Sequence, residues 1–503
     1  MPRPGLLHVV VVLTLTLGGI GADFSASTPS TSATPVAADP QVDNRPNIVL
    51  ITTDDQTTYD LRWMPLTRQA LGGSGRTFTR AISPHPLCCP ARAELLTGQY
   101  AQNNKVQHNI GKYGGYPRFR EQSTLATWLW ASGYRTAFHG KYLNQYSGRD
   151  VRQPGWEIWD PLVGGIYNYR NFTLYNNNMA RAAKYQDSYV TDVLARRTES
   201  SVRKFSRGRA PFFIWTSHVA PHARSAERNN GDEMQFERPA PAERHAGLFA
   251  TTTPPSLSKP NFNEADMSDQ PRQMRDRRKR PKNKVKTWFR SRIRSLQAVD
   301  ESVASLVRSL DRAGELDNTW IFFTSDNGYA LGEHRYFGKN FLNEEITGVP
   351  LVVSGPGVPN GSKSSVPVSL VDIPVTIADI ANVRPKLTAD GRSFLGVLKS
   401  GRSTGWRDTQ LIQTGSSRVR GKHPGWAFRG VRTARYVYAK DMQTGAKVLY
   451  DHKFDRYEIR NVANQRRYAR VVRELERRAQ LLRSCRGAGC NRRFGPPPAP
   501  LKR

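Results

Sequence analysis

Two pairs of polar residues each end an apolar run of the kind that forms a buried strand. Asp54 and Asp55 end one such run, and Asp326 and Asn327 end another. Carboxylate and amide oxygens are hard ligands, which suit Ca2+ or Mg2+ better than Zn2+ or Cu2+. Either pair alone is more typical of a turn or a helix cap. Their recurrence at two strand ends indicates a site for a hard cation.

Cys88 begins a segment that carries the signals of a short helix. Pro90 suits the first helical turn, and Gly98 suits a C-terminal cap. Cys88 is therefore predicted at a helix N-terminus, where backbone N–H groups favour an anion. A cysteine in such a place, taken alone, is more often a small buried apolar residue. The surrounding motif has to decide between these two interpretations.

Four candidate strands must position these groups. They are residues 47–53, 135–138, 212–216 and 320–325. Lys141 follows the second of them, and His218 and His222 follow the third. Open α/β sheets bind ligands beyond the carboxyl ends of their strands, so all these polar groups would converge if the strands were neighbours. The sequence leaves that adjacency open.

The remaining pattern is that of an α/β protein with a small appended sheet. Residues 294–313 place apolar side chains on one helical face and stop before the strand at 320–325. Residues 430–438 and 447–451 predict a hairpin with its turn near Thr444 and Gly445. A basic helix is predicted over 466–483. The sequence thus predicts a helix-flanked main sheet and a second, antiparallel one.

The two ends of the chain differ from its middle. Residues 1–22 have the basic start, apolar run and small residues of a secretory signal peptide, and residues 23–44 form a linker rich in Ser, Thr and Pro. No later segment is predicted to span a membrane. Residues 485–503 are a basic, Pro-rich tail for which we expect little fixed structure. We therefore expect a secreted or cell-surface protein.

Charge and cysteine content set further bounds. The formal net charge is +33, which favours polyanionic partners in general and also fits simple solubility. No nucleic-acid-binding motif accompanies the charge, so no specific nucleic-acid partner is predicted. Cys88 and Cys89 are too close in sequence to pair easily. Cys485 and Cys490 enclose a small loop, and the sequence leaves open whether they form a disulfide.

The motif around Cys88 resembles the signature of a known enzyme family. Cys88, Pro90 and Arg92, followed by Leu96-Thr97-Gly98, look like the signature of the type I sulfatases of the alkaline phosphatase superfamily, in which the first cysteine becomes formylglycine. The resemblance spans about residues 45–461. Its other motifs are residues 45–49 with Asp54 and Asp55, 140–144, 220–222, 324–329, Lys339 and 349–357.

The resemblance implies a fold and a division of the chain. The fold would be α/β, with a large central mixed sheet flanked by helices as in alkaline phosphatase and a small C-terminal antiparallel-sheet subdomain. The catalytic sulfatase domain would cover residues 45–385 and the C-terminal subdomain residues 386–484.

The resemblance also implies the site residues. Asp54, Asp55, Asp326 and Asn327 would hold one Ca2+ ion, which would also meet the formylglycine made from Cys88. Arg92 and Lys141 would stabilise this nucleophile, and His222 and Lys339 would contact the sulfate and its bridging oxygen. His218 and His334 are expected to be structural.

Sulfate ester hydrolysis is the reaction that the resemblance implies. One hydroxyl of the hydrated aldehyde would attack sulfur, and the other would later expel sulfate as the carbonyl re-forms. His222 would protonate the departing oxygen. The partners would be a sulfated small molecule or polysaccharide and a formylglycine-generating maturation enzyme.

Substrate class depends on the branch of the family. The Cys88-Cys89 pair and residues 140–146 are similar to the N-acetylglucosamine-6-sulfatase and heparan endosulfatase branch. Leu143 stands where many arylsulfatases have a histidine, and Asn343 stands where this branch commonly has tyrosine. Two alternatives stay open: a phosphoester or phosphonate hydrolase of the same superfamily, and an inactive secreted protein that binds polyanions.

Overall fold

Strand β1 (Asn47–Thr53) lies at the centre of the main sheet, parallel to β7 (Phe212–Ser217) on one side and β8 (Thr319–Ser325) on the other. Its side chains alternate between two hydrophobic cores: Ile48 and Leu50 lie in one, and Val49 and Ile51 lie in the other. A strand buried on both faces needs an unbroken apolar run, which explains why the sequence predicted it correctly.

The computed structural model describes residues 43–148, 150, 152–176, 178–225, 237–417, 421 and 423–502. The predicted signal peptide (1–22) and nearly all of the predicted linker (23–44) lie outside the described residues.

In this described part, the main sheet has ten strands in the order β12-β2-β11-β8-β1-β7-β3-β4-β5-β6. The strands not yet bounded are β2 (Gly75–Phe78), β3 (Arg135–Gly140), β4 (Ile158–Gly164), β5 (Phe172–Asn176), β6 (Asn178–Tyr185), β11 (Leu351–Ser354) and β12 (Ser362–Ser364). Strands β8, β1, β7, β3 and β4 are parallel, while β11 and β5 run antiparallel to their inner neighbours. The sequence left open whether the four strands with polar ends are neighbours, and the order β8-β1-β7-β3 shows that they are.

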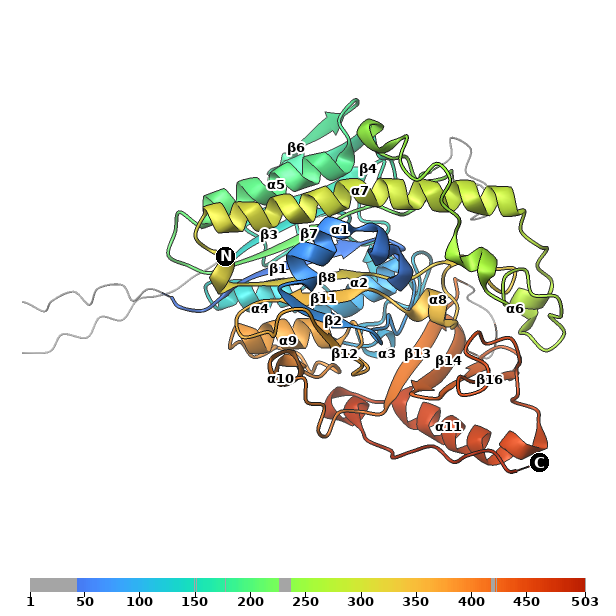
Figure 1. The fold of residues 1–503 in the computed structure, drawn as a ribbon. Coiled ribbons are helices and arrows are strands. Elements are labelled where there is room, and N and C mark those ends of the chain that lie inside the picture. Colours follow the sequence, from blue (N-terminus) through green and yellow to red (C-terminus); the bar gives the residue numbers. More distant parts are fainter. Residues whose placement is uncertain are drawn as a thin grey trace, which may run out of the picture. The chain divides into compact units, whose positions relative to one another are not determined.

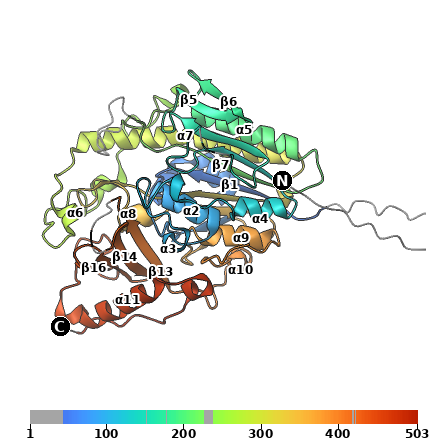
Figure 2. The same ribbon diagram turned by 180° about the vertical axis from the view of Figure 1, so that it is seen from behind.

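Helices cover both faces of this sheet (Figures 1 and 2). Helices α5 (Val190–Phe205) and α7 (Lys282–Arg312) pack on the face of Val49 and Ile51. Helices α2 (Cys88–Thr97), α4 (Leu125–Ala131) and α9 (Asp372–Ile380) pack on the opposite face. The predicted α/β fold is confirmed.

Helix α7 begins earlier than the predicted residue 294. Val285, Phe289 and Ile293 are buried and continue the helical face of the later turns. This stretch is also rich in basic residues, which stand among the apolar positions: Lys282, Lys284, Lys286, Arg290 and Arg292. The periodic apolar residues, and not the average polarity, decide the structure here.

The second sheet is antiparallel, in the order β13-β14-β15-β16, and α11 (Ala469–Leu482) lies against it. Its strands are β13 (Thr409–Gly415), β14 (Trp426–Thr433), β15 (Tyr436–Asp441) and β16 (Lys447–Asp451). The prediction of one strand over 430–438 was wrong, because the chain turns back between β14 and β15. The Thr433 hydroxyl oxygen accepts hydrogen bonds from the backbone N–H groups of Arg435 and Tyr436 and stabilises this turn.

The shorter elements connect these layers. They are α1 (Pro65–Thr67), α3 (Ala101–Asn104), α6 (Arg272–Arg275), α8 (Glu344–Thr347), α10 (Leu395–Ser400), β9 (Ala330–Leu331) and β10 (Phe337–Gly338). Among the described residues, no helix combines the length and the apolar character needed to cross a membrane.

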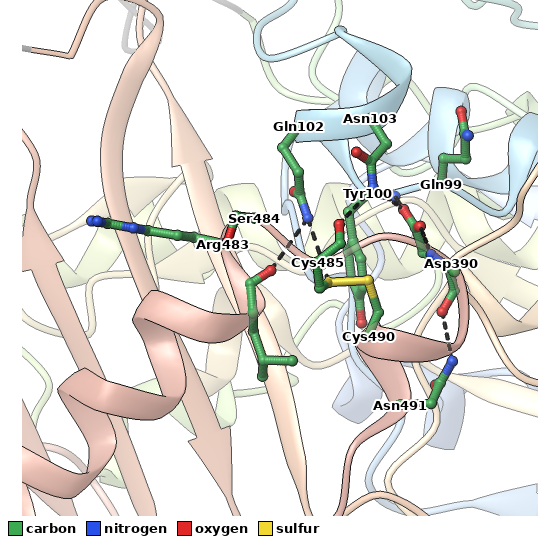
Figure 3. Close-up of a disulfide and its surroundings, with 12 residues drawn as sticks. Gln99, Tyr100, Gln102, Asn103, Asp390, Arg483, Ser484, Cys485, Cys490 and Asn491 are labelled. Carbon is green, nitrogen blue, oxygen red and sulfur yellow. Dashed lines mark hydrogen bonds between the residues drawn. A yellow bond between two sulfur atoms is a disulfide. The ribbon is translucent and has the colours of Figure 1, made fainter.

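The C-terminal tail is more ordered than predicted. Cys485 and Cys490 form a disulfide, and the loop that it closes lies beside α3 and Asp390 (Figure 3). The carboxylate of Asp390 accepts a hydrogen bond from the Gly487 backbone N–H at 2.8 Å. Further on, the Leu501 N–H donates to the Arg467 carbonyl at 3.0 Å. The expectation of little fixed structure was wrong for the described tail, up to residue 502.

The domain boundaries predicted at residues 385 and 484 stay predictions.

Candidate active site

The polar ends of β1 and β8 meet directly. The backbone N–H of Asp55 donates to Oδ1 of Asp326 at 3.2 Å, and Nδ2 of Asn327 donates to Oδ1 of Asp55 at 2.7 Å. This proximity follows from the parallel register, which pairs Thr53 with Ser325. The acidic groups from the two distant segments therefore form one cluster, as the sequence predicted.

Helix α2 brings Cys88 to this cluster. Its first residue is Cys88, and it ends at Gly98 in the left-handed conformation (φ 66°), as predicted. The Cys88 Sγ lies 3.3 Å from Oδ1 of Asp54. Lys339 Nζ lies 2.8 Å from the same sulfur and 2.5 Å from Oδ1 of Asp55. The cysteine sulfur therefore contacts one carboxylate and one ammonium group, and that ammonium group also binds Asp55.

Arg92 and Lys141 supply further positive charge. Lys141 forms an ion pair with Asp54. The Arg92 guanidinium donates to Oδ2 of Asp326 at 2.9 Å, to the Lys141 carbonyl at 2.7 Å and to the Ser217 hydroxyl at 2.6 Å. Arg92 thus fixes three chain segments around Cys88.

His222 completes the cluster from the loop after β7. Its Nδ1 lies 2.5 Å from the Ala223 carbonyl oxygen, which can only accept, so Nδ1 carries the proton. Its Nε2 lies 3.7 Å from Oδ2 of Asp55. The Tyr167 ring stacks on the imidazole with the ring centres 4.0 Å apart. The orientation directs Nε2 toward the acidic cluster.

Burial and charge set the protonation of these groups. Burial raises the pKa of Asp326 to about 6, and the neighbouring Asp54 carboxylate adds to this effect. Burial would also raise the pKa of Asp54, but Lys141, His222, Lys339 and Arg92 outweigh it and hold the pKa well below its ordinary value.

The two candidate reacting side chains are also shifted. Burial, with Asp54 beside it, raises the pKa of the Cys88 thiol to about 12. Burial lowers the pKa of His222 to about 4. These directions favour the neutral thiol of Cys88 and the neutral imidazole of His222.

The cluster fits a hard cation. Ligand atoms of Asp54, Asp55, Cys88 and His222 all lie within 4.8 Å of one another. Oδ1 of Asn327 is buried and has no hydrogen-bond partner among the described residues, which leaves an amide oxygen available as a ligand. Oxygen donors of this kind suit Ca2+. Asp326, also expected as a ligand, uses its oxygens on Arg92 and on the Asp55 N–H.

Two residues of the cluster were missed by the sequence analysis. Tyr167 lies after β4, and Lys141 Nζ lies 4.5 Å from the centre of its ring. Ser217 is the last residue of β7 and accepts a hydrogen bond from Arg92. A polar residue at a strand end was a usable signal for Ser217. Tyr167 carried no comparable signal.

Some residues gave weaker sequence evidence of a role in the active site. Leu143 belongs to the hydrophobic core beside α2, so this position packs and carries no polar group into the site. His334 pairs with Glu264 at 2.6 Å, and Asn343 donates to Glu458 at 2.7 Å. His218 is completely buried. The structural roles expected of His218 and His334 stay predictions.

Known proteins resemble both the sequence and the fold. The sulfatase family matches residues 46–383, and the family of N-sulphoglucosamine sulphohydrolase C-terminal regions matches residues 332–484. An arylsulfatase of Volvox carteri is 30% identical over 89% of this chain and 76% of its own length. The N-acetylglucosamine-6-sulfatase of Capra hircus is 34% identical over 73% of this chain and 66% of its own length.

One solved structure covers 87% of this chain and 97% of its own, with a TM-score of 0.70 and 24% identity. It contains a protein in complex with its substrate D-glucosamine-2-N,6-O-disulfate, and the likeness supports the predicted alkaline phosphatase-like sulfatase fold. The chain spans 34% of the extracellular sulfatase SULF-1 homolog of Drosophila melanogaster, so some relatives are much longer. Since the family match covers most of the described chain, this protein belongs to the sulfatase family.

Proposed function

We propose that this protein hydrolyses sulfate esters on sulfated sugars of the glycosaminoglycan type, with residue 88 as the nucleophile. The observation that carries the proposal is the position of Cys88 at the start of α2, within 3.3 Å of Asp54 and 2.8 Å of Lys339. The resemblance to N-acetylglucosamine-6-sulfatases supports the substrate class.

Each charged residue has a task in this proposal. Lys141 and Lys339 offset negative charge on the sulfuryl oxygens, since both ammonium groups reach the buried acidic cluster. Arg92 binds Asp326 and the Lys141 carbonyl and so orients the groups around residue 88. His222 keeps its Nδ1 proton on the Ala223 carbonyl and presents Nε2 for proton exchange with the leaving oxygen.

Two groups that the family typically uses are part of the proposal. Formylglycine, made from Cys88 by a maturation enzyme, supplies a hydrated aldehyde as nucleophile. Ca2+, held by Asp54, Asp55, Asp326 and Asn327, supplies positive charge beside it. The crowding of three carboxylates and the unpaired amide oxygen of Asn327 support the ion.

A pair of adjacent cysteines provides the decisive test. Cys88→Ala should lower sulfate release from N-acetylglucosamine-6-sulfate by about a thousandfold or more, as expected for loss of a nucleophile. Cys89→Ala is the matched control, because Cys89 is equally buried but its side chain belongs to the hydrophobic core. Normal turnover by the Cys88→Ala protein, matured in the same cells, would defeat the proposal.

Assays on the same protein preparation distinguish the two alternative functions from sulfatase activity. A phosphonate monoester hydrolase from Silicibacter pomeroyi shares the fold, with a TM-score of 0.63 and 19% identity. Parallel assays on matched aryl sulfate and aryl phosphate distinguish sulfatase from phosphoester hydrolase activity. An inactive polyanion-binding protein would release neither product and would keep a thiol at position 88.

We also propose that the protein is secreted or held at the cell surface. Residues 1–22 support this through their signal-peptide pattern, and extracellular sulfatases are among its relatives.

A further inference from the structure

A basic pocket of about 470 Å3 is lined by residues other than those of the candidate active site, and the mechanism above does not use it. Its size falls within the range of small-molecule pockets. Four cationic side chains and one carboxylate line it: Arg224, Arg238, Arg280, Lys284 and Glu237. Its remaining wall includes two aromatic rings, those of Trp288 and Phe337. We call it the basic pocket.

The basic pocket is joined to the active site by short chain segments. Arg224 lies two residues after His222, and Phe337 lies two residues before Lys339. Two residues of extended chain span at most about 7 Å. The backbone of Arg224 and Phe337 in the pocket wall therefore lies within about 7 Å of the backbone of His222 and Lys339 in the active site.

The charge of the basic pocket is only partly balanced by the protein. Glu237 forms an ion pair with Arg224. The Arg280 side chain is anchored, since its Nε donates to the Arg335 carbonyl at 3.1 Å. Arg238 and Lys284 are exposed, and no salt bridge to either is found among the described residues. An anion in the pocket would meet a surplus of positive charge.

The start of helix α7 adds to this field. Lys284 lies in its first turn, which contains no acidic residue, and the N-cap residue Pro281 offers no side-chain cap. Pro281 also lines the basic pocket. The Asn283 side chain accepts a hydrogen bond from the Lys284 N–H at 2.9 Å, but no acidic side chain of the helix offsets the partial positive charge of its N-terminus.

The aromatic part suits a sugar ring. Trp288 packs edge-on against Phe337, with ring centres 5.1 Å apart and an interplanar angle of 83°. The Phe337 ring is buried, while Trp288 is only half-buried. A rigid aromatic surface beside guanidinium groups fits a ligand that has both an apolar face and anionic substituents.

We propose that the basic pocket binds a second anionic sugar unit of a polymeric substrate, next to the unit that loses its sulfate. This inference rests on the proposed function for the choice of ligand. It assigns the enzyme a preference for sulfated chains over single sulfated sugars, with Arg238 and Lys284 as substrate-positioning residues.

The test compares binding of two ligands by calorimetry in the Cys88→Ala protein, so that no turnover interferes. The ligands are N-acetylglucosamine-6-sulfate and a heparin-derived tetrasaccharide. The Arg238→Gln/Lys284→Gln double variant should weaken tetrasaccharide binding about tenfold or more, because two charge-assisted contacts are lost. Binding of the monosaccharide should not change.

A matched control removes two exposed cations elsewhere. Lys399 and Arg402 lie in and after α10, far along the chain from the basic pocket. If Lys399→Gln/Arg402→Gln weakens tetrasaccharide binding as much as the pocket variant does, general charge attraction explains the effect and the inference is overturned. Equal binding by the pocket variant and the parent overturns it too. Failure of the proposed function is seen separately, as absence of sulfate release by the unmutated matured enzyme.

Discussion

Glu94 shows at the scale of one residue how burial changes an acid. It lies on α2, six residues after Cys88, and is completely buried. Burial, with Asp390 nearby, raises the pKa of its carboxyl well above the ordinary value. Ionisation of Glu94 therefore costs the folded chain more than the unfolded chain.

This cost predicts a pH-dependent effect of Glu94→Gln. As pH rises above the ordinary pKa of 4.5, the unmutated chain loses stability relative to the variant, which cannot ionise. The loss is about 1.4 kcal/mol per pH unit until the folded-state pKa is reached. Melting temperatures of both proteins between pH 4.5 and 8.5 measure it. A difference that stays constant over this range would show that Glu94 does not have a raised pKa.

At this scale the sequence predicted the acidic cluster well and its surroundings poorly. Asp54 and Asp326 were predicted because each directly follows a buried strand. Tyr167 stacks on His222, but no periodicity or spacing connects these two residues along the chain. Contacts between loops depend on the order of the strands in the sheet, and local sequence patterns do not reveal this order.

Helix α2 is the element that determines where Cys88 lies. Gly98, which caps its C-terminus, has φ 66°, and a Cβ added there would lie 3.2 Å from side-chain carbons of Ala389 and Val375. Gly314, after α7, has a similar φ of 71° but no heavy atom within 4 Å of such a Cβ. The two glycines share a backbone conformation and differ in their surroundings.

The two positions therefore predict different costs for an alanine. Gly314→Ala should lower the unfolding free energy by about 1–2 kcal/mol, the cost of a left-handed residue with a side chain. Gly98→Ala should lose about 1–3 kcal/mol more, because neighbouring side chains must move. Denaturant unfolding of the two variants measures both values. Equal losses would mean that the contacts around Gly98 yield without cost.

Strands and helices were predictable from the sequence where a single hydrophobic pattern ran through the whole element. Strands β1 and β8 were predicted from their apolar runs. The turn between β14 and β15 was missed, since residues 430–438 read as one continuous strand and only the Thr433 hydroxyl marks the reversal. The start of α7 was missed because Val285 and Phe289 stand among basic residues such as Lys284, Lys286 and Arg290.

For the molecule as a whole, the clustered carboxylates predict that calcium stabilises the fold. An ion that binds only the folded chain adds about 2.7 kcal/mol at a concentration 100 times its dissociation constant. The melting temperature should therefore rise with added Ca2+ and fall again with a chelator. Asp55→Asn should remove most of this response.

Asp311→Asn provides the control for that experiment, since Asp311 is exposed on α7. The response to Ca2+ should stay intact in this variant. If Ca2+ does not change the melting temperature of the unmutated protein, the assignment of the site is wrong.

The fold class was predictable from the sequence, whereas the order of the ten strands was visible only in the structure.

The complete burial of Cys88 sets an order of events in the life of the protein. Under the proposed conversion of Cys88 to formylglycine, a maturation enzyme would have no access to this sulfur once β1, β8 and α2 have packed together, so conversion would have to precede folding. Each molecule would then have a single opportunity to become active. The amount of active enzyme would depend on whether modification is faster than folding, and a chain that folds first would keep its thiol for as long as it stays folded.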